Sequence, residues 1–234
     1  MPKPVKSSAR VTAGAGTIFA LGVLFSCCGC SQPSEKLGPS DIARQVTPNP
    51  PAVPAVGANS RSFHIDYPDD PPRKIVFIVD RSGSMTDAFD FVKYALKRCV
   101  AYLNESEDWF HIISFSSGSP VEMPPRRLVN ATERNRWLAM EFIDTVIAEG
   151  ETDPSEALRR AFAVGPDTIL LLTDGEFAPE VAHLVKDLNK DGKVKVHTIG
   201  FLYKTGEAIL KQIAAENGGT YKFVTEADLA NLAK

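Results

Sequence analysis

The sequence predicts an α/β fold, with a doubly wound, mostly parallel sheet flanked by helices. From residue 73 onward, short apolar runs alternate with longer amphipathic segments, as strands and helices do in βαβ units. The runs at 75–79 and 168–173 show almost no polar alternation, which is typical of strands buried on both faces of a parallel sheet. Prolines break the segment 120–125, which confines a strand there to an antiparallel edge.

Composition divides the 234-residue chain into three parts. A hydrophobic content of 44% is enough for one full core and a tail. The net charge is −3 and no basic stripe is present, so we expect no nucleic-acid partner. We expect a signal or anchor segment at 1–30, a Pro-rich disordered linker at 31–72 and one folded domain at 73–234.

The amino-terminal segment has the plan of an export signal. Lys3, Lys6 and Arg10 precede an uncharged stretch, 11–30, that is rich in apolar and small residues. Basic residues stay on the cytoplasmic side of a membrane. The sequence therefore predicts a membrane-anchored protein whose domain lies on the extracytoplasmic side, at the cell membrane, in the periplasm or at the cell surface.

Three cysteines end this segment: Cys27, Cys28 and Cys30. The cluster resembles a bacterial lipoprotein signal, in which a cysteine after a small residue is lipidated. Phe25 departs from that pattern, because a smaller residue is usual there. A plain anchor helix is the alternative, and the sequence does not decide between the two or say which cysteine would be modified.

Nine of the 17 prolines fall within 31–72, where periodic apolar residues are rare. Such a segment cannot bury enough apolar surface to offset the entropy of ordering it, so we expect it to be extended. The alternating residues 63–67 could add a strand to the edge of the domain or could belong to the linker, and both readings stay open.

Within the domain, the first predicted helix starts at Asp87 as N-cap and runs to about Asn104. Cys99 falls on its apolar stripe and is expected to pack in the core. The segment Trp109–Phe115 is the second strand. A helix over Glu133–Ile147 follows, and its inward face is expected to carry Met140, Ile143 and Ile147.

The next helix has a clear start, with Asp153 as cap and Pro154 in the first turn. After the strand at 168–173, apolar spacing predicts helices at 181–188 and 209–214. Between them, residues 194–198 alternate and predict a half-exposed strand. The last strand is Tyr221–Val224, and Thr225 caps a short terminal helix.

Hydroxyl and carboxylate side chains gather in three loops. Asp80, Ser82 and Ser84 follow the first apolar run, at the strand end where open α/β sheets place ligands. Two later loops add Thr152, just before a helix, and Asp174, after another buried strand. All five offer hard oxygen atoms, which suit Mg²⁺, Mn²⁺ or Ca²⁺ rather than zinc.

This order of residues resembles the von Willebrand factor type A domain with its metal-ion-dependent adhesion site. The family pattern is Asp-x-Ser-x-Ser, then a Thr, then an Asp, matched here by Asp80, Ser82, Ser84, Thr152 and Asp174. The resemblance covers about 73–234. It implies a Rossmann-like fold and a divalent ion that the hydroxyls bind directly and the aspartates often bind through water.

The resemblance also implies a function: the ion captures a Glu or Asp of a partner protein. We therefore expect a metal-dependent, membrane-tethered protein-interaction module rather than an enzyme. Glu151 departs from the family, which often has Gly there, and its role stays open. Asp153 is expected to cap its helix and not to bind metal.

The sequence offers two alternative functions. A Mg²⁺-dependent phosphatase-like enzyme would use Asp80 as nucleophile, but such enzymes need a second Asp where Ser82 stands, and a hydroxyl cannot act as acid or base there at neutral pH. A structural domain without metal binding is the other alternative, and the intact set of five residues argues against it.

Overall fold

The computed structural model describes residues 73–201, 203–225 and 228 of the chain. The predicted segments 1–30 and 31–72, and with them the possible strand at 63–67, lie outside the described residues. None of the helices among the described residues combines the length and the hydrophobicity that crossing a membrane requires.

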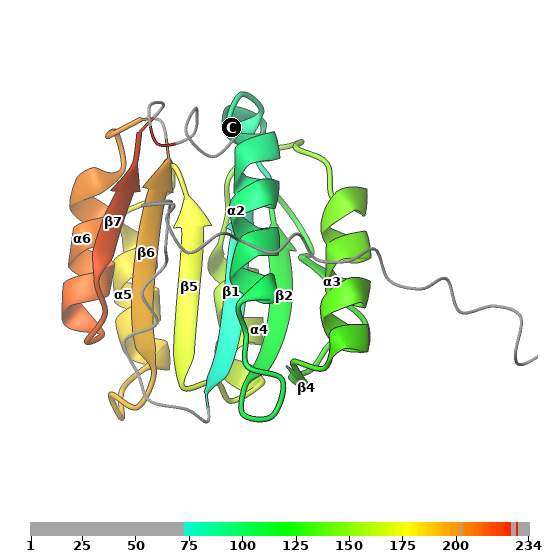
Figure 1. Cartoon of the computed structure of the whole chain (residues 1–234). Coiled ribbons are helices and arrows are strands. Elements are labelled where there is room, and N and C mark those ends of the chain that lie inside the picture. Colours follow the sequence, from blue (N-terminus) through cyan, green and yellow to red (C-terminus); the bar gives the residue numbers. More distant parts are fainter. Residues whose placement is uncertain (1–72, 202, 226–227, 229–234) are drawn as a thin grey trace, which may run out of the picture. The chain divides into compact units, whose positions relative to one another are not determined.

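A seven-stranded sheet forms the centre of the domain (Figure 1). Its strands are β1 (Lys74–Asp80), β2 (Trp109–Phe115), β3 (Val121–Glu122), β4 (Val129–Asn130), β5 (Thr168–Thr173), β6 (Lys195–Phe201) and β7 (Tyr221–Val224). The order is β3-β2-β1-β5-β6-β7, with β4 also paired to β2. The five longer strands are parallel, and β3 and β4 are antiparallel to β2. The predicted fold is confirmed, with two short antiparallel strands where one was expected.

Helices cover both faces of the sheet. They are α2 (Phe89–Ala101), α3 (Glu133–Thr145), α4 (Ser155–Ala163), α5 (Glu180–Leu188) and α6 (Glu207–Glu216), with a short 3₁₀ turn, η1 (Gly83–Met85). In Figure 1, α2 stands in front of the sheet, and α4 and α5 lie behind it. Apolar side chains of α2 and α3 pack on one face, and those of α4, α5 and α6 on the other.

The central strand β1 serves both cores, which explains its uninterrupted apolar sequence. Phe77 points into the core under α2 and α3, and its neighbour Ile78 into the core under α4, α5 and α6. Both side chains are fully buried. Cys99 of α2 is buried in the first core, which confirms its predicted packing role.

The predicted start of the first helix was wrong. Helix α2 has Ala88 as its N-cap residue, and Asp87 lies in the preceding turn without capping it. The turn η1 leads directly into the helix, because the Ala88 N–H donates to the Met85 carbonyl and the Phe89 N–H to that of Thr86. Backbone carbonyls therefore satisfy the first amides, and no side-chain cap is needed. The helix ends at Ala101, before the expected Asn104.

Two predictions of burial were also wrong. Ile147 is 61% exposed, because α3 ends at Thr145 and the chain then becomes extended at Val146. Strand β6 is buried along its length apart from Lys195, where a half-exposed strand was expected. It lies between β5 and β7, and side chains on both of its faces join a core. The predicted Ile143 is buried and Met140 is half-buried.

The start of α4 lies one residue later than predicted, because Pro154 is the N-cap residue and Ser155 is the first helical residue. The Ser155 N–H donates to Asp153 Oδ1 at 2.9 Å, so Asp153 satisfies an amide at the start of α4 without occupying the N-cap position. At the end of the described chain, the Asp228 N–H donates to Thr225 Oγ1 and the Thr225 N–H donates to Asp228 Oδ2. This is the reciprocal pattern of a capping box. Asp228 is helical, and its neighbours on both sides lie outside the described residues.

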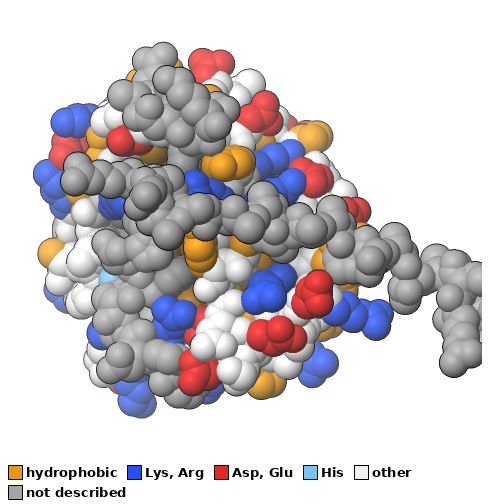
Figure 2. Space-filling model, viewed as in Figure 1, with side chains coloured by type: hydrophobic (Ala, Val, Ile, Leu, Met, Phe, Trp, Pro, Cys, Tyr) orange, Lys and Arg blue, Asp and Glu red, His pale blue; other side chains and the backbone are white. Residues whose placement is uncertain are grey.

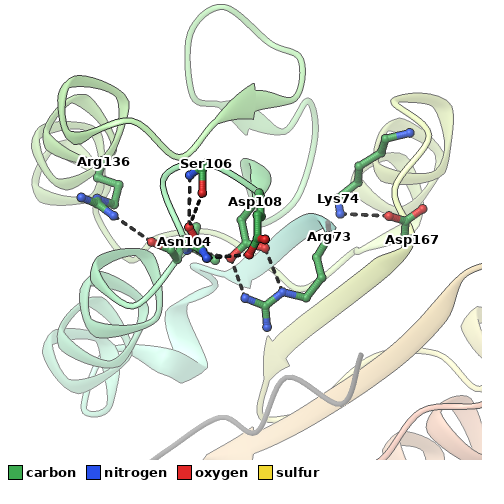
Figure 3. A network of polar contacts seen from close by, with 9 residues as sticks. Arg73, Lys74, Asn104, Ser106, Asp108, Arg136 and Asp167 are labelled. Atoms are coloured by element: carbon green, nitrogen blue, oxygen red, sulfur yellow. Dashed lines mark hydrogen bonds and ion pairs between the residues drawn. The ribbon is translucent and has the colours of Figure 1, made fainter. Parts of the chain in front are cut away.

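The amino-terminal ends of the strands are joined by a polar network (Figure 3). Asp108 is buried and accepts hydrogen bonds from Arg73 Nε at 2.9 Å and from the Asn104 N–H at 2.8 Å. Nearby, the Lys74 N–H donates to Asp167 Oδ2 at 3.0 Å. On the surface, Figure 2 shows positive and negative side chains interspersed over the visible face.

Candidate metal centre

The predicted site lies at the carboxyl-terminal ends of β1 and β5, which are neighbours in the sheet. Asp80 is the last residue of β1. The register pairs Val79 with Leu172, so Thr173 and Asp174 leave β5 at the level where Asp80 leaves β1. Asp80 and Asp174 are both buried. Two acidic side chains are thus placed at one edge of the sheet, where open α/β folds bind ligands.

Asp80 accepts hydrogen bonds from two neighbouring groups. Its Oδ1 accepts a hydrogen bond from the Ser82 N–H at 2.8 Å, and its Oδ2 accepts one from the Thr173 hydroxyl at 2.6 Å. The hydroxyls of Ser82 and Ser84 lie 3.0 Å apart. The predicted residues Asp80, Ser82 and Ser84 are therefore brought together in one tight turn.

Asp174 is less well satisfied. Its Oδ1 accepts a hydrogen bond from the Glu176 N–H at 3.1 Å, whereas its buried Oδ2 has no hydrogen-bond partner among the described residues. Within the same part of the chain, neither Asp80 nor Asp174 forms an ion pair with a lysine, arginine or histidine. Burial, with a smaller contribution from the nearby charge of Asp174, raises the pKa of Asp80 to about 6, against the lowering effect of its hydrogen bonds. The two carboxylates therefore lack a compensating positive charge.

The loop that carries Thr152 is tied to the loop after β1. The Glu149 N–H donates to the Arg81 carbonyl at 2.7 Å, and the Gly83 N–H donates to the Gly150 carbonyl at 2.9 Å. Gly150 has a φ of +83°, a conformation that favours glycine. Thr152 follows on this loop and is half-buried. No hydrogen bond joins Thr152 to the other four predicted ligands in the described part of the chain.

Two residues at the site were not predicted from the sequence. Thr173 both donates to Asp80 and accepts a hydrogen bond from the Gly175 N–H at 3.0 Å, so it orients the first carboxylate. Arg81 forms an ion pair with Glu149 at 2.9 Å and fastens the loop of Thr152. A hydroxyl at the end of an apolar run, and an arginine directly after a buried strand, are the signals that could have pointed to them.

The two acidic neighbours of Thr152 differ. Glu151 is exposed, and its backbone N–H donates to Ser117 Oγ at 3.2 Å. Asp153 accepts a hydrogen bond from the Ser155 N–H at the start of α4, and hydrogen bonding by Ser155 lowers the pKa of Asp153. The side chain of Asp153 is thus engaged by its own helix, although Pro154 is the N-cap residue, and the carboxylate of Glu151 is left at the surface.

The donor set fits a hard divalent cation. No group of three or more His, Cys, Asp and Glu side chains in the described residues is arranged to hold a metal ion. An ion at this edge would therefore depend on hydroxyls together with two carboxylates, the oxygen ligands that suit Mg²⁺ or Mn²⁺. The unpartnered Oδ2 of Asp174 is a buried acceptor that such an ion would satisfy.

Comparisons with known proteins agree with the fold. The family model described as "von Willebrand factor type A domain" matches residues 73–223. The chain is 29% identical over 176 residues to inter-alpha-trypsin inhibitor heavy chain H4 from Sus scrofa. That match covers 66% of this chain and 18% of the relative, so the chain corresponds to less than a fifth of its length.

Two solved structures share the architecture. A von Willebrand factor type A protein from Catenulispora acidiphila superposes with a TM-score of 0.59 at 24% identity, covering 69% of this chain and 40% of that one. An aerotolerance-related membrane protein from Bacteroides fragilis gives a TM-score of 0.54 at 21% identity, covering 69% of this chain and 96% of its own. At these identities the likeness concerns the fold alone.

Proposed function

The chain belongs to the von Willebrand factor type A domain family, and from this premise we propose that it is a tethered, metal-dependent protein-interaction module. It would act by binding an acidic group of a partner protein, without chemistry of its own. The observation that carries the proposal is the pair of buried carboxylates, Asp80 and Asp174, without a positive partner among the described residues. Buried charges are normally paired or bind a metal ion.

The five predicted ligands have different roles in this proposal. Asp80 and Asp174 supply the two negative charges that balance a divalent ion. Ser82, Ser84 and Thr152 supply neutral oxygens, which complete coordination without removing more positive charge. When bound, Mg²⁺ or Mn²⁺ supplies a Lewis-acidic position that a Glu or Asp carboxylate can occupy. Thr173 and Arg81 position this set through their contacts with Asp80 and Glu149.

We also propose that residues 1–30 anchor the protein in a membrane and that 31–72 space the domain from it, outside the cytoplasm. The basic start and uncharged stretch of the sequence support this arrangement. Fractionation that recovers the full chain in the soluble cytoplasm would contradict it. Fatty-acid labelling that is lost when Cys27, Cys28 and Cys30 are all changed to Ser would identify a lipoprotein rather than an anchor helix.

Mn²⁺ provides a direct test of metal-dependent capture, because its bound water relaxes solvent protons. The full chain is added to Mn²⁺, and the proton relaxation rate is followed as a short peptide with one central Glu is titrated. We expect the chain to enhance relaxation and the peptide to reduce that enhancement by displacing water. The same peptide with Gln in place of Glu is the control.

Two variants sharpen this test. Asp80→Asn should lose the enhancement, because one of two neutralising charges is removed. Thr152→Val keeps the shape of the side chain and removes one neutral ligand, so it should weaken the response to the Glu peptide more than the response to Mn²⁺. No enhancement by the unaltered chain, or an equal effect of the Gln peptide, would refute the proposed function.

A further inference from the structure

A cavity of about 390 Å³ lies beside the candidate metal centre, between the starts of α4 and α5. Thr152 lines this cavity and is also a predicted metal ligand, so the two sites share a residue. A partner segment that places a carboxylate at the metal centre would therefore bring its neighbouring side chains to the cavity. The residues that line the cavity then determine which type of partner side chain can bind beside that carboxylate.

Part of the cavity wall is apolar. Pro154 and Val181 are buried, and Phe177 and Leu184 are half-buried. Together they offer a surface for methylene groups or an apolar side chain. A surface of this kind favours burial of a long aliphatic stem, because apolar area is removed from water.

The rim of the cavity is charged. Asp153 and Glu180 are exposed carboxylates, and Arg159 is the one basic residue among the described residues that line the cavity. Asp153 is already engaged by α4 and lies near Arg159, which helps to lower the pKa of Asp153. Glu180 forms no ion pair within the described residues. A cationic head group above the apolar wall would meet Glu180 without displacing an existing partner.

The residues around both sites, 80–84, 149–159 and 174–180, carry an excess of negative charge. Six of their carboxylates are exposed, namely Glu149, Glu151, Asp153, Glu156, Glu176 and Glu180. Against them stand Arg159 and the Arg81 that is paired with Glu149. The amino-terminal ends of α4 and α5 add only about half a positive charge each. An acidic partner residue that approaches this rim is repelled unless basic residues accompany it.

We propose that the cavity receives a Lys or Arg side chain from the same partner segment whose Glu or Asp occupies the metal centre. The stem packs on Phe177, Val181 and Leu184, and the head group pairs with Glu180 at the rim. An apolar side chain would pack against the apolar part of the wall but would not neutralise the negative charge of the rim. This inference rests on the proposed function and adds its specificity: an acidic and a basic residue a few positions apart.

A random peptide library displayed on phage tests this pairing. The library is selected on the immobilised full chain, once in Mn²⁺ and once in chelator. We expect Mn²⁺-dependent enrichment of peptides with Asp or Glu and, within about three residues, Lys or Arg. In a synthetic peptide from this set, replacing the basic residue by norleucine should weaken binding about five- to tenfold.

Two variants on the same helix identify the residue responsible. Glu180→Gln should abolish the preference for the basic residue over norleucine, with the requirement for the acidic residue unchanged. Asp187→Gln is the matched control, because Asp187 is an exposed carboxylate on α5 that does not line the cavity, and it should retain the preference.

The outcomes separate this inference from the proposed function. Mn²⁺-dependent peptides with an acidic residue and no neighbouring basic residue would overturn the inference and leave the function standing. Basic peptides enriched equally in chelator would contradict the metal centre, and with it the pairing. Absence of any enrichment would count against both.

Discussion

The two ends of the sheet treat buried carboxylates in opposite ways. At the amino-terminal ends, Asp108 is fully buried and is paired with Arg73, with a further hydrogen bond from Asn104 (Figure 3). At the carboxyl-terminal ends, Asp80 and Asp174 are also buried, but no cationic side chain pairs with either in the described residues. The buried carboxylate at the amino-terminal end is paired within the chain, whereas the two at the carboxyl-terminal end have no positively charged partner among the described residues.

The two ends therefore differ in role: the carboxylate of Asp108 belongs to an ion pair within the fold, whereas Asp80 and Asp174 belong to the candidate binding site. Removing one member of a buried ion pair leaves the other uncompensated, so the pair at Asp108 is costly to break. Two unpaired buried carboxylates destabilise the protein, and in the proposed function a bound cation would offset this cost. The same residue type therefore stabilises one edge of the sheet and destabilises the other.

The largest expected effect comes from breaking the satisfied end. Asp108→Asn removes the charge that balances Arg73, and we expect the free energy of unfolding to fall by about 3 kcal/mol. Urea denaturation of the full chain measures it. The control is Asp144→Asn, which breaks the exposed ion pair with Lys97 and should cost about 0.5 kcal/mol. Equal losses in the two variants would remove the distinction drawn for the amino-terminal end.

At the carboxyl-terminal end of the sheet, the contribution of Asp80 to stability should fall as pH rises. A carboxylate that stabilises the protein when ionised has the opposite effect, because stability then rises with pH. Burial raises the pKa of Asp80 from 3.8 to about 6 in the metal-free chain. A raised pKa means that the stability contributed by protonated Asp80 is fully present below the unfolded value of 3.8 and is lost as pH rises through about 6.

The measurement is the free energy of unfolding of the unaltered chain minus that of Asp80→Asn, in chelator. We expect this difference to fall by about 2 to 3 kcal/mol between the two ends of that pH range. Saturating Mg²⁺ should reverse the trend, because the ion stabilises the ionised form. A difference that rises with pH in chelator would show that Asp80 is already compensated within the chain.

Removal of a neutral ligand should have a smaller effect. Thr152→Val deletes a hydroxyl and preserves the volume of the side chain, so we expect Mn²⁺ affinity to fall about fivefold and urea stability in chelator to change by less than about 0.5 kcal/mol. The matched control is Thr145→Val, because the Thr145 hydroxyl bonds the Phe142 carbonyl on α3, away from the site. Unchanged Mn²⁺ affinity in Thr152→Val would exclude Thr152 from the ligand set.

Features of the fold that depend on local patterns were predictable from the sequence. The strands β1 and β5 are short apolar runs without polar alternation, and Asp80, Ser82 and Ser84 alternate directly after the first of them. Their close approach follows from a turn of a few residues. Thr152 and Asp174 were placed at the site by their loops, one before a helix and one after a buried strand, and the family pattern added to this; metal binding by the five residues stays a prediction.

Features that depend on distant parts of the chain were not predictable. The bond from Thr173 to Asp80 joins residues 93 positions apart and follows from the register between β1 and β5. Strand β6 has an alternating sequence, yet it is buried because β7 and the helices cover it. The start of α2 was missed because backbone carbonyls of η1 replace the side-chain cap that Asp87 was expected to provide.

The most direct test of the central claim is calorimetric titration of the full chain with Mn²⁺, compared with Asp174→Asn. The substitution keeps the hydrogen bond that Asp174 Oδ1 accepts and replaces the unpartnered Oδ2 by a neutral amide. We predict one Mn²⁺ bound by the unaltered chain and none by Asp174→Asn, which should be at least as stable as the unaltered chain in chelator. No uptake by the unaltered chain, or equal uptake by the variant, would contradict the claim that this end of the sheet is built for a divalent ion.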